Sequence, residues 1–244
     1  MREQNRNTFK FTKQRAGAPD MSVFTTEGKN VFIFSGAEPK IPVIYLNTVS
    51  GEGQKVFEAA QTAGCPPFTL VAISDLDWNH DMVPWDSPAA FKKGESFTGG
   101  ADDYLRLLVE EIIPKAEKEL PGPPTWRGIA GYSLAGLFAL YSIYRTDLFS
   151  RVGCMSGSLW FPGFKEYVFS HEPKCRPDCI YFSLGDKEAK TRNSVLKTVQ
   201  ENTEEIQAFY QSKGIDTVFQ LNPGNHFVQG IERTIAGIQW LLRR

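Results

Sequence analysis

Six short apolar runs, separated by segments with helical spacing, constrain the fold of this chain more than any other feature of its sequence. Each run is nearly continuous in apolar residues, which is the pattern of a strand buried on both faces. The runs are Ile41–Leu46, Phe68–Ile73, Arg127–Tyr132, Val152–Met155, Cys179–Leu184 and Thr217–Leu221. Strands of this kind are typical of a parallel sheet that carries helices on its two faces.

The segments between these runs place apolar residues at helical spacing. The clearest examples are Tyr104–Ile113, Leu134–Tyr144, Leu196–Tyr210 and Ile231–Leu241. Pro121 ends the first pattern and Gly214 ends the third. Because strands alternate with helices along the chain, the sequence predicts an α/β fold of three layers with a mostly parallel central sheet.

Two segments depart from this alternation. Ser22–Thr26 and Asn30–Ser35 flank the turn-forming residues Glu27–Lys29, and together they predict an opening β-hairpin. Ser74–Gly100 is rich in proline and glycine and holds tryptophans among polar residues. A connection of this length without periodicity of its own is usually functional, so we expect it to form a wall of a binding cleft.

Length and charge limit the class of protein. The chain has 244 residues, of which 41% are hydrophobic, and this fits one domain over residues 1–244. A net charge of -1 argues against nucleic acid and against an anionic membrane surface as partners. Residues 1–20 are polar, so we expect a loosely ordered N-terminal segment without the apolar core of a secretory signal. The expected location is the cytoplasm, with a secreted mature form as the alternative.

The four cysteines favour no metal site. Cys175 and Cys179 have a C-x3-C spacing, but no second pair and no nearby histidine completes a zinc site. Cys65 and Cys154 stand apart from them. We therefore expect four reduced thiols, no metal and no cofactor.

One serine lies where a strand is expected to meet a helix. Gly131–Gly136 reads Gly-Tyr-Ser-Leu-Ala-Gly, at the end of a buried run and the start of an apolar helical segment. A nucleophile elbow requires this context, with small residues here at Gly131 and Ala135 so that strand and helix can approach closely. The sequence therefore predicts Ser133 as a nucleophile. The alternative is a plain strand-to-helix turn whose serine caps the helix.

A serine hydroxyl needs a neighbouring base to take its proton. His226 lies in the turn-rich loop Asn222–Phe227, after the last predicted strand and before the last predicted helix. This is the place of the base in the chain order serine, acid, histidine. His171 is expected on the surface, and His80 precedes the serine, so His226 is the predicted base.

The acid is expected just after the strand Cys179–Leu184. Asp186 and Glu188 both lie there, and either carboxylate could hold the imidazole tautomer and stabilise the imidazolium. We prefer Glu188, because a residue farther past the strand end reaches the histidine loop better. Asp186 is the alternative acid, and it could instead cap a following helix.

The oxyanion that forms during attack needs preorganised N–H donors. The N–H of Leu134, directly after the nucleophile, is one predicted donor. The second is expected from the loop after the strand Ile41–Leu46, that is, from Asn47 or Thr48.

Several stretches carry a resemblance to a known family. They are Pro42–Leu46, Trp85, Phe97–Ala101, Glu110–Pro114, Gly131–Tyr141 and Ser156–Trp160. Through them the chain, from about Ile41 to its C-terminus, resembles the putative esterase group of α/β hydrolases, which includes esterase D-like and enterochelin (ferric siderophore) esterases. The resemblance implies the α/β-hydrolase fold, with Ser133 as nucleophile, His226 as base and Glu188 as acid.

The chain departs from that family's pattern in two places. The family usually has His before the serine and Gly two residues after it, whereas this chain has Tyr132 and Ala135. The resemblance implies an Arg of the siderophore-cleaving members in the loop that corresponds to Asp77–Asp81, whereas this chain has Trp78 there. Because a cation suits an iron–catecholate anion, the resemblance favours an esterase but not a siderophore substrate.

Aromatic residues are the predicted substrate contacts. Trp78, Trp85 and Trp160 could form an aromatic platform for a flat or sugar-like group, with Tyr132 beside the nucleophile. The sequence thus predicts a serine carboxylic ester hydrolase that forms an acyl-enzyme from a small-molecule ester. The alternatives are an acyltransferase with the same triad and a catalytically silent binding module of the same fold.

Overall fold

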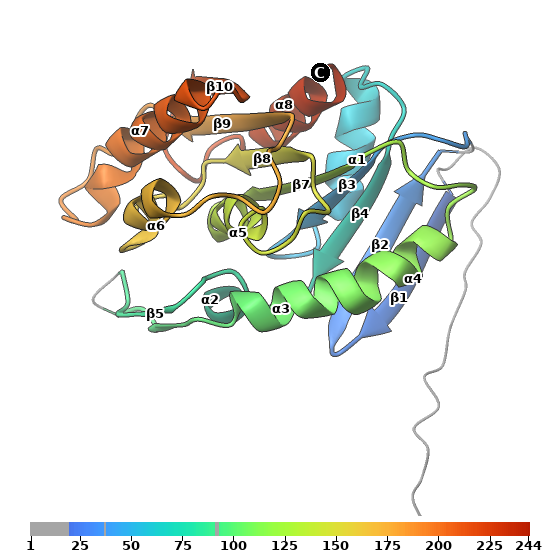
Figure 1. Cartoon of the computed structure of the whole chain (residues 1–244), viewed down its shortest axis with the longest axis horizontal. Helices are drawn as coiled ribbons and strands as arrows, with labels where there is room; N and C mark the ends of the chain where they lie inside the picture. Colours follow the sequence, from blue (N-terminus) through green and yellow to red (C-terminus); the bar gives the residue numbers. More distant parts are fainter. Residues whose placement is uncertain (1–19, 37, 91–92) are drawn as a thin grey trace, which may run out of the picture.

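The computed structural model of the chain describes residues 20–36, 38–90 and 93–244 (Figure 1). The polar segment predicted over residues 1–20 lies outside the described residues except for Asp20, which begins the first strand.

An eight-stranded sheet forms the centre of the structure, in the order β1-β2-β4-β3-β7-β8-β9-β10 (Figure 1). Its strands are β1 Asp20–Thr26, β2 Lys29–Ser35, β3 Val43–Asn47, β4 Thr69–Ser74, β7 Arg127–Tyr132, β8 Arg151–Met155, β9 Cys179–Gly185 and β10 Asp216–Asn222. All pairs from β4 to β10 are parallel, and only β1 and β2 run antiparallel to their neighbours. The predicted mostly parallel sheet is therefore confirmed.

Helices cover both faces of the sheet. They are α1 Gly53–Thr62, α3 Ala101–Leu107, α4 Ile113–Lys118, α5 Leu134–Ser142, α6 Phe164–Ser170, α7 Val199–Ser212 and α8 Gly230–Leu242. Helices α1 and α8 contact each other and one face, while α3 to α7 share a core with the other face (Figure 1). The predicted three layers are present.

Strand β3 shows why the apolar runs are continuous. Val43 and Tyr45 belong to the core shared with α5, whereas Ile44 and Leu46 belong to the core shared with α1 and α8. Successive side chains of a strand point to opposite faces, so a strand covered on both faces must be apolar at every position.

The hairpin has a tighter turn than the sequence predicts. Thr26 pairs with Lys29, which leaves Glu27 and Gly28 as a two-residue turn. Both have positive φ, 45° and 75°, as a type I′ turn requires.

The helices differ from prediction in two places. A single π-helical turn, Leu108–Ile112, interrupts the expected helix Tyr104–Ile113 and joins α3 to α4. Helix α1 was not predicted, although its buried residues Val56, Phe57 and Ala60 have helical spacing. Its short apolar stripe extends over little more than one turn, which is too little for a pattern to stand out.

The long connection Ser74–Gly100 contains short elements that its sequence does not reveal. They are α2 Trp78–Asp81 and a two-stranded ribbon of β5 Asp86–Ser87 and β6 Phe97–Thr98. The N–H of Gly100 donates to the carbonyl of His80 at 2.9 Å, and a Cβ on Gly100 would overlap the His80 ring. These contacts fix the end of the connection at the start of α3.

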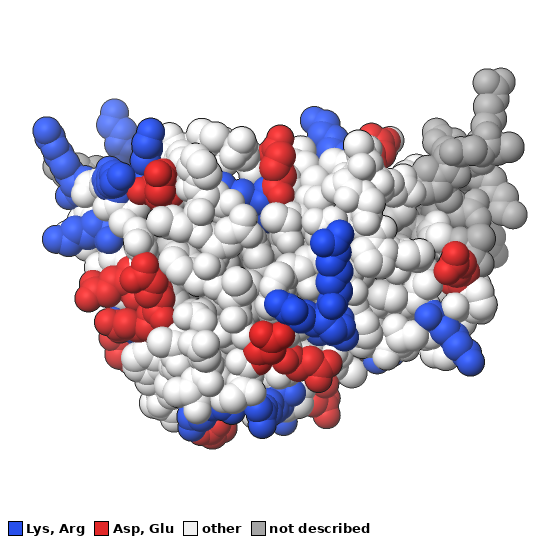
Figure 2. Space-filling view, turned by 90° about the horizontal axis from the view of Figure 1, so that it is seen from above, with Lys and Arg blue, Asp and Glu red and all other residues white. Residues whose placement is uncertain are grey.

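The surface carries charges of both signs. On the face seen in Figure 2, basic and acidic side chains occur in small groups separated by uncharged surface. No helix in the described part of the chain combines the length and the apolarity needed to cross a bilayer.

Candidate active site

Ser133 is the single residue between strand β7 and helix α5. Its backbone has φ 63° and ψ −125°, a conformation that is strained for any residue with a Cβ. The N–H of Ser133 donates to the carbonyl of Met155 at 3.1 Å, which ties the turn to β8. This sharp, strained strand-to-helix turn is the geometry of a nucleophile elbow.

The small residues around Ser133 are required by the closeness of strand and helix. A Cβ on Gly131 would lie 2.3 Å from the carbonyl carbon of Ala135 and 2.5 Å from its methyl group. A Cβ on Gly136 would come within 3.0 Å of the Gly131 carbonyl oxygen. The methyl group of Ala135 is itself fully buried. The elbow therefore accommodates Ala135 because Gly131 opposite it has no side chain.

Three side chains from three loops form one hydrogen-bonded line. The Oγ of Ser133 lies 3.0 Å from Nε2 of His226, and Nδ1 of His226 lies 2.8 Å from Oε2 of Glu188. The loops follow β7, β10 and β9, whose carboxyl ends meet at one edge of the sheet. Since Nδ1 donates to the carboxylate, Nε2 is left to accept the serine proton.

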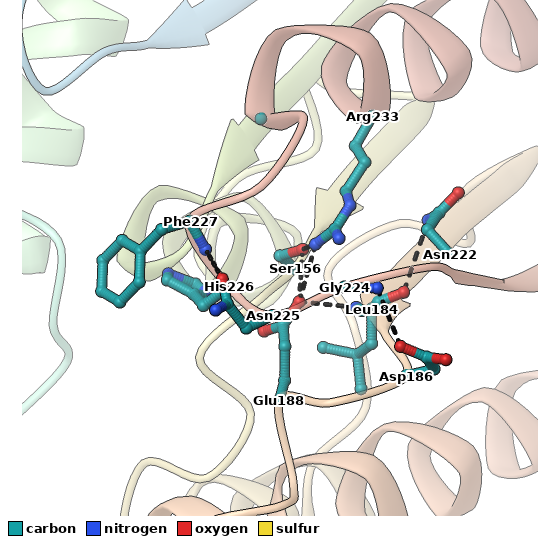
Figure 3. A network of polar contacts seen from close by, with 12 residues as sticks. Ser156, Leu184, Asp186, Glu188, Asn222, Gly224, Asn225, His226, Phe227 and Arg233 are labelled. Atoms are coloured by element: carbon teal, nitrogen blue, oxygen red, sulfur yellow. Dashed lines mark hydrogen bonds and ion pairs between the residues drawn. The ribbon is translucent and has the colours of Figure 1, made fainter.

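Asp186, the alternative acid, lies apart from the imidazole (Figure 3). Its Oδ1 accepts from the N–H of Gly224 at 2.8 Å, and its own N–H donates to the carbonyl of Asn222 at 2.7 Å. Asp186 therefore holds the loop that carries His226, while Glu188 contacts the ring. No helix begins next to Asp186 that it could cap.

The carboxylate of Glu188 is buried and fully engaged, with a side chain only 4% exposed. Its second oxygen, Oε1, accepts from the N–H of Gly185 at 2.6 Å and from Oγ of Ser156 at 2.8 Å. Burial raises the pKa of Glu188, but hydrogen bonding and charge from His226 and the hydrogen bonds from Gly185 and Ser156 outweigh it, so the pKa lies below its ordinary value. Glu188 is thus held as the anion.

Arg233 of α8 completes this network, although it is not among the residues predicted from the sequence. Its Nη1 donates to Glu188 at 3.0 Å and to the hydroxyls of Ser156 and Tyr132 at 3.1 and 3.2 Å. The residue is only 2% exposed. A Cβ on Gly185 would come within 2.9 Å of the guanidinium, so this glycine makes room for it. Arg233 could have been found as a cation one turn before Gly237, on the buried and otherwise mostly apolar face of α8.

Tyr132 was predicted to contact substrate, and the structure joins it to the base. Its hydroxyl donates to the backbone carbonyl of His226 at 2.7 Å, and the two rings lie 5.3 Å apart. The side chain also lines a cavity together with Trp78. Tyr132 therefore lies between the His226 loop and a possible substrate site.

The two predicted sources of the second oxyanion donor both lie within the hydrogen-bonding pattern of the sheet. The N–H of Thr48 donates to the carbonyl of Ile73 at 2.8 Å, which contradicts the prediction for Thr48. Asn47 is the last residue of β3, with strand partners on both sides, and its side chain accepts from the hydroxyl of Tyr104. The strand runs one residue farther than predicted. Val49 is then the first residue of the loop whose N–H has no acceptor among the described residues.

The first donor, Leu134, occupies the position that the sequence predicts. It is the first residue of α5, and the first N–H groups of a helix have no partner within the helix.

The three tryptophans lie in two groups. Trp78 lines the cavity beside Tyr132. Trp85 donates from Nε1 to the carbonyl of Pro162 at 2.9 Å, and Trp160 packs against Phe97 with ring centroids 6.1 Å apart. Within the described residues no ring contact links Trp78 to the other two. Trp85 and Trp160 instead belong to one aromatic cluster around Phe97 and Phe161, so contact of all three tryptophans with a substrate stays a prediction.

The residues described here also include no group of three or more His, Cys, Asp or Glu side chains arranged to hold a metal ion. The four cysteines are free thiols, and Cys154 and Cys179 are buried.

The chain is similar to known proteins in its sequence profile and in its fold. Residues 32–236 match the profile of the family described as Putative esterase. The siderophore hydrolase EstA from Aspergillus nidulans superposes with a TM-score of 0.70 at 16% identity, over 95% of this chain and 97% of that one. The IroE-like serine hydrolase from Shewanella oneidensis gives 0.75 at 19% identity, over 92% and 80%.

A ferulic acid esterase also superposes, with a TM-score of 0.63 at 14% identity, over 91% of this chain and 96% of that one. At these identities the structures show a shared fold, which is that of α/β-hydrolase esterases. No curated protein matches the chain in sequence.

Proposed function

Because this chain belongs to the Putative esterase family and is a carboxylic ester hydrolase, we propose that it cleaves its substrate through an acyl-enzyme on Ser133. One observation carries the proposal. Ser133, in its strained elbow, is hydrogen-bonded to His226, and His226 is hydrogen-bonded in turn to the buried Glu188. Nucleophile, base and orienting carboxylate in this order are the parts of a serine hydrolase.

Each step uses an atom of this line. His226 Nε2 takes the proton of Ser133 as Oγ attacks the ester carbonyl carbon, and Glu188 stabilises the imidazolium. The oxyanion accepts a hydrogen bond from the N–H of Leu134 and another from the loop after β3, where the N–H of Val49 is the first candidate. Nε2 then gives its proton to the leaving alcohol, and water activated by the same nitrogen releases the acid and restores Ser133.

Hydrolysis is favoured over acyl transfer by the exposure of the base. The His226 side chain is 28% exposed, so water can reach Nε2 once the alcohol has left. An acyltransferase with the same triad would instead give a new ester when an acceptor alcohol is added. Product analysis with and without that alcohol distinguishes the two reactions.

A fluorophosphonate probe tests the nucleophile. Wild-type protein should be labelled and Ser133→Ala should not. Ser158→Ala is the matched control, because Ser158 Oγ lies only 3.4 Å from Ser133 Oγ. Labelling of Ser133→Ala at the wild-type rate, or loss of labelling only in Ser158→Ala, would contradict the assignment.

The substrate we propose is a small-molecule ester. The similar proteins include siderophore hydrolases and a ferulic acid esterase. The chain carries Trp78 in the loop Asp77–Asp81.

We further propose that the described residues act as one domain, since one sheet with a core on each face joins them. The cytoplasmic location stays a prediction from the sequence.

A further inference from the structure

A cavity of about 150 Å³ lies at the carboxyl ends of β3 and β7, between the first turns of α1 and α8. Its walls include Val49, Trp78, Tyr132, Ile231 and Thr234. Its lining is mostly apolar, and it lies beside the elbow. The proposed mechanism assigns no role to this cavity.

Tyr132 connects the cavity to the reacting groups. It directly precedes Ser133, and its hydroxyl donates to the carbonyl of His226 at 2.7 Å. Val49, on another wall, belongs to the loop that we expect to bind the oxyanion. A group attached to the carbonyl carbon above Ser133 therefore has a partly open, mostly apolar cavity beside it.

The size of the cavity limits that group. An apolar protein cavity of about 150 Å³ holds one benzene molecule. One six-membered ring or a short branched aliphatic group would fill this cavity, and a long acyl chain would extend beyond it.

The charges around the cavity limit the group further. Glu52 is the only charged residue among those that line it. The guanidinium of Arg233 is buried and already paired with Glu188. An anionic group would therefore meet a carboxylate and no cation, and burying such a charge without a partner is costly.

The position of Phe227 distinguishes the two halves of the ester. The leaving oxygen must face His226 Nε2, which returns the proton to it. Phe227 follows His226, is 89% exposed, and has its ring centroid 5.3 Å from the imidazole, turned away from the Glu188–Arg233 network (Figure 3). The alcohol half thus meets an open apolar surface, and the partly open cavity remains for the acyl half.

We propose, on the basis of the serine esterase function above, that the substrate is an uncharged ester with a compact apolar acyl group, no larger than benzoyl, which occupies the cavity lined by Trp78, Tyr132 and Ile231. The alcohol half lies on the open side at Phe227 and has no fixed size limit.

Filling the cavity tests the size limit. Ile231→Trp narrows it on the half-buried first turn of α8. With 4-nitrophenyl esters, kcat/KM for the benzoate should fall about tenfold or more relative to wild type, while the acetate stays within about threefold. Leu221→Trp, a substitution of the same kind on the exposed edge of β10, should change neither ester.

Enlarging the cavity gives an independent readout. Ile231→Ala should raise kcat/KM for 4-nitrophenyl hexanoate relative to the acetate. Equal effects of Ile231→Trp on acetate and benzoate, or a wild-type preference for the decanoate, would overturn the acyl cavity. If wild type hydrolyses none of these esters, or Ser133→Ala hydrolyses them equally well, the proposed function itself fails.

A charged acyl group tests the second limit. The mono-4-nitrophenyl ester of succinate should react at least about tenfold more slowly than 4-nitrophenyl pentanoate, which has similar length without the charge. Glu52→Gln should narrow this gap. A succinate ester that reacts as fast as the pentanoate would overturn the claim that the cavity excludes anions.

Discussion

The two sides of His226 differ in how firmly the structure holds them. On the acid side, Glu188 is buried and its Oε1 accepts three hydrogen bonds, one of them from Arg233. On the substrate side, Val49 and Phe227 are 58% and 89% exposed. The acid side holds the side chain of Glu188 in one position, and the substrate side leaves space for a substrate. Changes on the acid side should therefore affect every ester, and changes on the substrate side only some of them.

Removing the base should have the largest effect, because His226 belongs to both regions. His226→Ala should lower kcat by about 10⁴-fold or more for all esters, since no other group takes the proton of Ser133. The control is His171→Ala, an exposed histidine that is expected to change nothing. Ester turnover with matched circular dichroism spectra measures the effect. Residual activity within tenfold of wild type would contradict the assignment.

The two carboxylates of the β9 loop should differ by orders of magnitude. Glu188→Gln should lower kcat by about 10³- to 10⁴-fold, because the amide no longer holds the imidazole tautomer. Asp186→Asn should cost less than about tenfold, since Asp186 supports only the backbone of the His226 loop. Kinetics of both variants on one ester decide between them. The reverse order would make Asp186 the acid.

Loss of the buried cation should appear mainly as loss of stability. Arg233→Met leaves the Glu188 anion buried without its ion pair, which costs about 3–5 kcal/mol in similar cases. Arg243→Met, on the exposed end of the same helix, should have little effect. Urea unfolding of the two variants measures the difference. A variant at Arg233 as stable as wild type would show that the pair contributes nothing.

The acid side should also make stability depend on pH. The pKa of Glu188 lies below its ordinary value in the folded state, so its contribution to stability is complete above the ordinary value and is lost as pH falls through the lowered one. Glu188→Gln should therefore lose less stability than wild type on acidification below about pH 4.5. Urea unfolding at a series of acidic pH values compares them. Parallel curves would contradict the shift.

The substrate side should give the smallest effect. Phe227→Ala removes an exposed ring, so stability should change by less than about 0.5 kcal/mol. If the alcohol half lies on this ring, kcat/KM should fall several-fold for benzyl acetate and stay unchanged for ethyl acetate. Equal kcat/KM changes for both esters would place the alcohol elsewhere.

The end of β3 shows how a one-residue error changes the site. The sequence predicts the strand to end at Leu46, because Asn47 is polar, yet Asn47 is only 3% exposed and pairs on both sides. Its polar side chain is accommodated by a hydrogen bond from Tyr104, a residue far away in the sequence. That partner belongs to α3, so no local pattern could reveal it. The oxyanion loop therefore begins one residue later.

The sequence by itself determined the alternation of the main strands with helices, the elbow around Ser133 and the place of His226. These follow from local rules, namely continuous apolar runs, the small residues that a tight turn needs, and chain order. Only the tertiary structure decided between Glu188 and Asp186 as the partner of the imidazole, brought Arg233 into contact with Glu188, and separated Trp78 from the other tryptophans. Those outcomes depend on which side chains from distant segments meet in space. A buried polar or charged side chain needs a partner there, because burying it unpaired costs free energy.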